Sequence, residues 1–193
     1  MRVSERNHEF EHLLTETRRL YARLRQTVHD QWNRDLPFAE LLFDRWERAR
    51  ELGFGEGTSI YHSSYVYGDV RVGRRTWIGP FTILDGTGGL AIGDNCSISS
   101  GVQIYTHDTV KWALTGGAAG HDHAPVEIGN CCYVGPNAVV AKGVAIGEHS
   151  VVGAASFVNS DIPPYSIAVG APCRSVGSVR LDGSDVTFEY ERA

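Results

Sequence analysis

The chain contains only four cysteines in 193 residues, and no two of them form a Cys-x-x-Cys pair. A disulfide-stabilised secreted domain needs a cysteine framework and a zinc ribbon needs that spacing, so the sequence argues against both classes. Cys96 and Cys132 fall at positions expected inside the molecule, where a thiol acts as a small apolar side chain. We therefore expect the cysteines to have structural roles only.

The sequence also lacks a long apolar segment and any excess of positive charge. No run is long enough to span a bilayer, and residues 1–8 carry no apolar stretch typical of a secretory signal. The formal net charge of -5 at pH 7 disfavours a general surface for nucleic acid or anionic lipid, although small anionic ligands need only a local basic cluster. These features favour a cytoplasmic protein without a membrane or nucleic-acid partner.

What the sequence has in abundance is an aliphatic residue at every sixth position over long stretches. Such a short, sustained period is typical of a solenoid, in which each unit adds one strand and one corner to a stack. The repeating positions are Ile60, Val66, Val72, Ile78, Leu84, Ile92, Ile98, Ile104, Ile128, Val134, Val140, Ile146, Val152 and Val158. We expect these side chains to point inward in a continuous column, with neighbouring strands paired in parallel.

A compact side chain lies four positions after most of these aliphatic residues. A narrow triangular coil requires this, because a second bulky group would overfill its interior. The compact residues are Thr76, Thr82, Cys96, Val102, Cys132, Ala138, Val144, Ser150 and Ser156. The pattern therefore predicts an all-β solenoid.

Two segments ahead of the repeat show the apolar spacing of amphipathic helices, from about residue 7 to 32 and from 38 to 52. Pro37 suits a first helical turn and Gly53 suits a C-terminal stop. We expect these helices to cap the coil stack, with a role in acceptor binding or subunit contacts as the alternative. The predicted domains are a helical segment at 1–56, a solenoid at 57–174 with a loop at 105–125, and a C-terminal tail at 175–193.

The six-residue repeat is interrupted twice, and the two interruptions contain the candidate functional residues. The first is a glycine-rich stretch that predicts a turn, with Asp85 at a corner of the prism. Between Ile104 and Ile128 the six-residue positions are no longer apolar, so residues 105–125 are expected to leave the solenoid as a protruding loop. His107 lies at the root of that loop, where a strand holds it more firmly than a loop tip would. Histidine exchanges protons near neutral pH, so His107 is the candidate general base.

Several motifs that are modest alone occur here in a specific order and spacing. They are Ile92-Gly-Asp-Asn, Thr106-His107, Pro125-Val-Glu-Ile-Gly, Tyr133-Val-Gly, Lys142-Gly-Val-Ala-Ile-Gly, Val152-Val-Gly-Ala-Ala, Asp161-Ile-Pro-Pro and Val169-Gly-Ala-Pro-Cys-Arg. From about residue 72 to 174 the chain thus resembles the hexapeptide acyltransferases, specifically sugar O-acetyltransferases of the galactoside and maltose acetyltransferase type. The resemblance implies a left-handed parallel β-helix that transfers an acetyl group from acetyl-CoA, a co-substrate, to a sugar hydroxyl without any other cofactor.

Site residues follow from the resemblance together with side-chain chemistry. His107 is the catalytic base. Asp85 stands where similar enzymes place a carboxylate that binds sugar hydroxyls, although it also suits a purely structural role in a turn. Tyr105 and Trp112 are aromatic side chains able to stack on a sugar ring or to pack the loop. The candidates for acceptor binding are therefore Asp85, Tyr105 and Trp112.

The candidates for acetyl-CoA binding lie in the later coils and beyond them. They are Gly135, Lys142, Gly153, Ala154, Ser160 and Arg174. The small residues would let a pantetheine arm approach the backbone, although the repeat itself also favours small residues there. Arg174 matches a basic residue that can meet coenzyme A phosphates. Ser160 departs from the family, which often has lysine before Asp-Ile-Pro-Pro.

The sequence leaves several alternatives open. The relatives' acceptor-binding asparagine is missing from residues 77–81, which favours a larger acceptor such as a nucleotide-linked sugar, and N-acetylation of an amino sugar is the runner-up activity. His121 and His123 are expected to be solvated, yet with neighbouring carboxylates they could bind a metal, as in a γ-class carbonic anhydrase. A non-catalytic scaffold is a third class. Flat faces and a long loop predict a homotrimer with shared sites.

Overall fold

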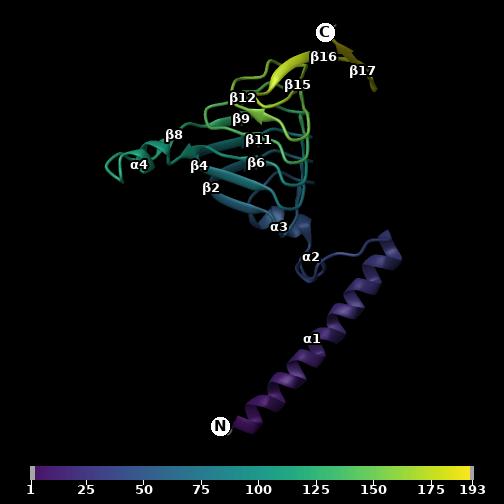
Figure 1. Ribbon diagram of the computed structural model, residues 1–193. Coiled ribbons are helices and arrows are strands. Elements are labelled where there is room, and N and C mark those ends of the chain that lie inside the picture. The colour runs from purple at the N-terminus through teal and green to yellow at the C-terminus, as the bar shows by residue number, and fades with distance from the viewer. Residues whose placement is uncertain (1–2, 192–193) are drawn as a thin grey trace. The chain divides into compact units, whose positions relative to one another are not determined.

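A computed structural model of the chain describes residues 3–191 and divides it into two compact units, residues 1–44 and 45–193 (Figure 1). The first unit contains α1 (Val3–Trp32) and α2 (Phe38–Leu42). Tyr21 of α1 meets Phe38 of α2 edge to face, with ring centroids 5.7 Å apart. None of the described helices is long and apolar enough to cross a membrane.

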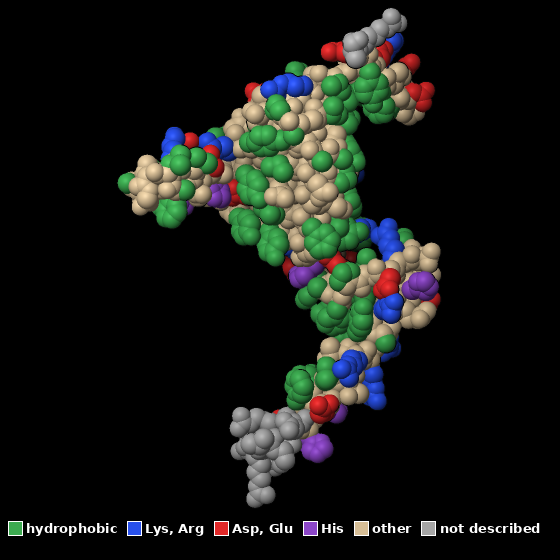
Figure 2. Space-filling model, in the orientation of Figure 1, with side chains coloured by type: hydrophobic (Ala, Val, Ile, Leu, Met, Phe, Trp, Pro, Cys, Tyr) green, Lys and Arg blue, Asp and Glu red, His purple; other side chains and the backbone are tan. Residues whose placement is uncertain are grey.

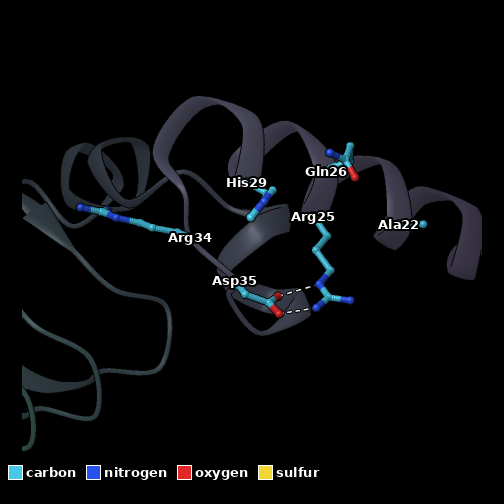
Figure 3. A pocket seen from close by; sticks show the side chains of 6 residues that line it. All are labelled: Ala22, Arg25, Gln26, His29, Arg34 and Asp35. Atoms are coloured by element: carbon cyan, nitrogen blue, oxygen red, sulfur yellow. Dashed lines mark hydrogen bonds and ion pairs between the residues drawn. The ribbon is translucent and has the colours of Figure 1, made fainter.

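An ion pair joins α1 to the segment between α1 and α2. Arg25 donates two side-chain hydrogen bonds to the carboxylate of Asp35, one of them at 2.7 Å, and the two residues line a small hollow (Figure 3). The predicted second helix proves to be two, because the backbone at Phe43 is extended, with φ -115° and ψ 130°. The second piece, α3 (Arg45–Glu51), belongs to the other unit.

That second unit is the predicted β-helix, and the fold is confirmed. One parallel face is formed by β1 (Ser59–Ile60), β3 (Trp77–Ile78), β5 (Ser97–Ile98), β10 (Tyr133–Val134), β13 (Val151–Val152) and β15 (Ser166–Val169). The remaining parallel strands are β2 (Tyr65–Val72), β4 (Ile83–Ile92), β6 (Gln103–Ile104), β9 (Val126–Ile128), β11 (Val139–Val140), β12 (Ala145–Ile146) and β14 (Phe157–Val158). After them β16 (Arg174–Asp182) and β17 (Asp185–Tyr190) form an antiparallel hairpin.

The core is the predicted column of aliphatic side chains. Every repeating position named above is buried except Val66, which is partly buried and packs against the core. The compact fourth positions are buried as well, and two of them carry thiols that donate to backbone carbonyls of the next coil, Cys96 to Gly129 and Cys132 to Gly147, each at 3.1 Å. Ala49 of α3 joins this core, so α3 closes one end of the stack.

The first break in the repeat is a strand and not the predicted turn. β4 continues through Asp85, pairing with β6 at Ile83–Leu84 and with β9 at Leu90–Ile92. The prediction was wrong because the register of β2 against β4 shifts between Gly68 and Val70. This irregularity accommodates the change in the six-residue phase without ending the strand. A Cβ on Gly68 would lie 2.6 Å from the carbonyl carbon of Gly86, so glycine permits the close approach.

The second break is the predicted protruding loop, which projects from the coils beside β4 and β9 (Figure 1). It contains β7 (His107–Asp108), α4 (Val110–Leu114) and β8 (Asp122–His123). β7 and β8 pair in antiparallel fashion, with His107 opposite His123 and Asp108 opposite Asp122. The root of the loop is therefore a short two-stranded antiparallel ribbon formed by β7 and β8.

Candidate active site

His107 and Asp85 form a hydrogen-bonded pair at the root of the loop. Nδ1 of His107 lies 2.6 Å from Oδ2 of Asp85, and the two side chains are 30% and 2% exposed. The pair arises because β4 and β6 are adjacent in the stack, which brings the residues that follow Leu84 beside those that follow Ile104. The imidazole is thus partly exposed to solvent while its partner is buried.

The Asp85 carboxylate is fully engaged by donors. Oδ1 accepts from the backbone N–H of Thr87 at 3.0 Å and from the Thr87 hydroxyl, and Oδ2 accepts from the backbone N–H of Thr106 at 2.9 Å. Burial by itself raises the pKa of this carboxyl, but the hydrogen bonds from Thr87, Thr106 and His107 together hold it well below its usual range. Asp85 is therefore ionised across the neutral range.

An ionised carboxylate at Nδ1 determines what the imidazole can do. It accepts a hydrogen bond from Nδ1–H, so the neutral ring carries its proton there and Nε2 keeps a lone pair. The buried charge also stabilises the imidazolium that forms when Nε2 takes a proton. His107 is consequently oriented as a proton acceptor whose reactive nitrogen lies opposite the Asp85 contact.

His121 and His123 lie beside His107, which sequence reasoning did not anticipate. Their rings stack near that of His107, with centroid distances of 6.2 Å and 5.7 Å, and both residues are exposed. The antiparallel pairing of β7 with β8 brings them there, and the glycine-rich loop gave no register from which to predict it. Among the described residues, no group of three histidine, cysteine or acidic side chains is placed to hold a metal ion.

A cluster of four charges fixes the base of the ribbon. Nζ of Lys142 lies 3.2 Å from Asp108 and 3.0 Å from Asp122, and Nζ of Lys111 lies 3.1 Å from Asp122. Hydrogen bonds from Lys142 and Lys111 lower the pKa of Asp122, and the two carboxylates raise the pKa of Lys142. Figure 2 shows histidine and charged side chains gathered at this root. Lys142, predicted to bind the donor, is thus engaged within the protein.

The other acceptor candidates have neighbours of their own. The Tyr105 hydroxyl, just after β6, donates to Oε1 of Gln103 in that strand at 2.8 Å. Trp112 of α4 is 48% exposed, and its ring meets His121 edge to face at 6.2 Å. The structure therefore brings Asp85, His107 and Trp112 into one region through His121, and their roles toward an acceptor stay predictions.

Among the donor candidates, the glycines have a packing explanation. A Cβ on Gly135 would lie 2.6 Å from the backbone nitrogen of Ala154, and a Cβ on Gly153 would lie 2.7 Å from Cγ1 of Val169. A Cβ at either position would therefore press on the next coil, whatever binds outside. Ser160 is exposed, and Arg174 is exposed with its guanidinium donating to the carbonyl of Cys173 at 2.6 Å. Their donor-binding roles stay predictions.

A shallow hollow of about 550 Å³ lies on the surface next to the Asp85 network. Thr87 and Gly88 line it. The Thr87 N–H donates to Oδ1 of Asp85 at 3.0 Å, and the Gly88 N–H donates to the Thr106 hydroxyl at 2.7 Å. Its polar lining includes Asp69, Arg71 and Glu127. A second hollow of about 390 Å³ shares Ala91 and Glu127 with it, so the two continue along one face of the prism.

Comparison with known proteins supports this architecture. Residues 125–160 match the family described as bacterial transferase hexapeptide (six repeats), and residues 69–106 match the hexapeptide repeat of succinyl-transferase. The galactoside O-acetyltransferase of Escherichia coli (strain K12) is 34% identical over 98 residues, which cover 47% of this chain and 48% of that protein. The chain thus spans about half the length of this curated relative.

Two solved structures share the fold. A maltose O-acetyltransferase from Clostridium difficile 630 superposes with a TM-score of 0.58 at 26% identity, covering 88% of this chain and 89% of the other. AntD, an N-acyltransferase from Bacillus cereus solved with dTDP and coenzyme A, gives a TM-score of 0.58 at 23% identity, covering 68% and 88%.

The repeats, the coils and these matches define the class: the chain is a left-handed β-helix built from hexapeptide repeats. Its repeats match the two hexapeptide family models over part of the chain, and it is similar to sugar O-acetyltransferases.

Proposed function

We propose that this protein transfers an acetyl group from acetyl-CoA to a hydroxyl of a sugar or sugar derivative. The observation that carries the proposal is the His107–Asp85 pair, in which a buried, ionised carboxylate orients an accessible imidazole at the root of the loop. A sugar hydroxyl attacks poorly until a base removes its proton, and this pair supplies such a base. The named activities of the galactoside and maltose enzymes support the same reaction class.

The reaction needs no covalent intermediate on the protein. Nε2 of His107 takes the proton from the acceptor hydroxyl while the oxygen attacks the thioester carbonyl carbon. The tetrahedral intermediate then collapses, the carbon–sulfur bond breaks, and the leaving coenzyme A thiolate receives the proton from the imidazolium. Asp85 keeps its negative charge throughout and stabilises the imidazolium by its hydrogen bond at Nδ1.

The assembly and the acceptor belong to the same proposal. In a homotrimer each loop would reach a neighbouring prism, so that donor and acceptor meet in a groove between subunits. Trp112, exposed on α4 and in contact with His121, would cover the acceptor ring from the loop side. We place the reaction in the cytoplasm, where acetyl-CoA is available to it.

The test is an acceptor panel assayed with acetyl-CoA, with release of free thiol as the readout. Galactosides, maltose, nucleotide-linked sugars and amino sugars should be compared at equal concentration. Acetyl transfer to a hydroxyl of at least one acceptor supports the proposal, and mass spectrometry of the product identifies the acetylated atom. Transfer only to amines would change it to N-acetylation. No binding of coenzyme A, judged by thermal shift, would favour a scaffold instead.

A further inference from the structure

One face of α1 carries an apolar stripe whose positions recur every three or four residues, the spacing of an amphipathic helix. The stripe consists of Phe10, Leu13, Leu14, Leu20, Tyr21, Leu24 and Val28. Thr17 lies in the same stripe, and its hydroxyl donates to the carbonyl of Leu13 at 2.8 Å. That bond satisfies the hydroxyl on its own helix, so Thr17 does not interrupt the stripe with an unpaired polar group.

The N-terminal half of this stripe is open to solvent. Within the part of the chain that the structure describes, α2 contacts the stripe toward its C-terminal half, where Phe38 meets Tyr21. Phe10, Leu13 and Leu20 are 62%, 65% and 43% exposed. Helices in proteins draw most of their stability from packing of such a face, and a contiguous exposed apolar patch marks an interaction surface.

The charges on α1 indicate which partner fits. Residues 8–16 contain only acidic charges, whereas residues 17–29 contain only basic ones. The acidic residues are Glu9, Glu11 and Glu16, and the basic residues are Arg18, Arg19, Arg23 and Arg25. Of these, Arg19 already pairs with Glu16 and Arg25 with Asp35. A second α1 in parallel would place like charges side by side, but an antiparallel one places the acidic half of each helix against the basic half of the other. Within residues 8–29 the helix is therefore complementary in charge to an antiparallel copy of itself.

We propose that α1 pairs in antiparallel orientation with α1 of a second copy of this chain, about a twofold axis between Thr15 and Glu16. In that register Phe10 meets Tyr21 of the other copy and Leu13 meets Leu20. Glu11 faces Arg18 on one flank of the stripe, where coiled coils place their charged pairs. Twofold symmetry forms each of these contacts twice. This surface would join copies independently of any contact between the β-helices.

Cysteine cross-linking of the full-length chain tests the orientation. Leu13→Cys and Leu20→Cys are prepared separately, then oxidised alone and as a mixture, with the unsubstituted chain as the background for native thiols. The antiparallel register predicts cross-linked dimers in the mixture. Each variant alone should give little, since identical positions lie about 7 Å or about 13 Å apart along the axis. Strong cross-linking of Leu13→Cys alone would indicate a parallel bundle, and no cross-linking in any sample would mean that something else covers the stripe.

Charge reversal tests the register and separates it from a general effect on the helix. Glu11→Arg and Arg18→Glu should each weaken self-association about fivefold by sedimentation velocity over a concentration series. The double variant restores the opposite charges and should recover the association. Arg23→Glu, an exposed position away from the stripe, is the matched control and should have little effect. Equal losses in all variants, or no recovery in the double variant, would overturn the proposal.

Discussion

Nδ1 of His107 lies 2.6 Å from Oδ2 of Asp85, whose side chain is only 2% exposed. Sequence reasoning placed these residues in different roles, one as base and one as an acceptor ligand. The geometry joins them in a single unit in which the buried residue orients the partly exposed one, and the role of Asp85 toward an acceptor stays a prediction.

Asp85→Asn should lower kcat by about one to three orders of magnitude, because an amide neither fixes the Nδ1–H tautomer nor stabilises the imidazolium. The KM for acetyl-CoA should change little, since Asp85 lies on the acceptor side of the proposed reaction. Steady-state kinetics with both substrates measure the two effects. Asp94→Asn, which removes the charge of a partly buried carboxylate paired with Arg74, is the control. Normal kcat in Asp85→Asn would exclude the positioning role.

Lys142→Met should loosen the base of the ribbon, because Lys142 bridges Asp108 and Asp122 on its two strands. We expect faster amide hydrogen exchange at residues 107–109 and 121–124, and a kcat about tenfold lower from misplacement of the base. Lys111→Met, which removes a more exposed contact to Asp122 alone, should have a smaller effect. A rise in the KM for acetyl-CoA with unchanged exchange would instead assign Lys142 to donor binding.

Arg174→Ala should raise the KM for acetyl-CoA more than the KM for the acceptor. Its guanidinium is exposed and would contact a phosphate of the donor without touching the reacting atoms. Initial rates over a matrix of both substrate concentrations separate the two constants. Arg180→Ala, a basic residue further along β16, is the comparison. Unchanged constants in Arg174→Ala would show that other groups hold the nucleotide.

Gly135→Ala should destabilise the protein by about 1 to 3 kcal/mol, because the new Cβ would press on the backbone of the next coil. Gly120→Ala is the matched control, since nothing lies within 4 Å of a Cβ at that position. Denaturant unfolding of both variants gives the difference. If Gly135→Ala were as stable as the control but bound coenzyme A poorly, the glycine would serve the ligand and not the stack.

The sequence predicted the coils well, because a six-residue period leaves little choice of side-chain direction. Ile60, Ile78 and Ile98 are all fully buried, as inward positions of successive coils should be. The His107–Asp85 pair could also have been predicted from this register, because β4 pairs with β6 at Leu84 and Ile104. Extending that pairing by a few residues brings Asp85 beside the loop root.

Features outside the repeat were harder to predict. The contacts of His121 and His123 with His107 depend on how β8 folds back on β7, and glycines and alanines in between set no register. The interruption of the second helix results from the extended backbone at Phe43, which the spacing of apolar residues does not predict. The ion pairs of Lys142 with Asp108 and Asp122 follow from that same ribbon.

His107→Ala tests the central claim most directly, because it removes the proposed base and creates no core cavity at this partly exposed position. Turnover with a competent acceptor should fall by about two to four orders of magnitude, while circular dichroism and coenzyme A binding stay near normal. His121→Ala and His123→Ala, which remove the neighbouring rings, should cost much less. Near-normal turnover in a folded His107→Ala variant would contradict the mechanism and require another base.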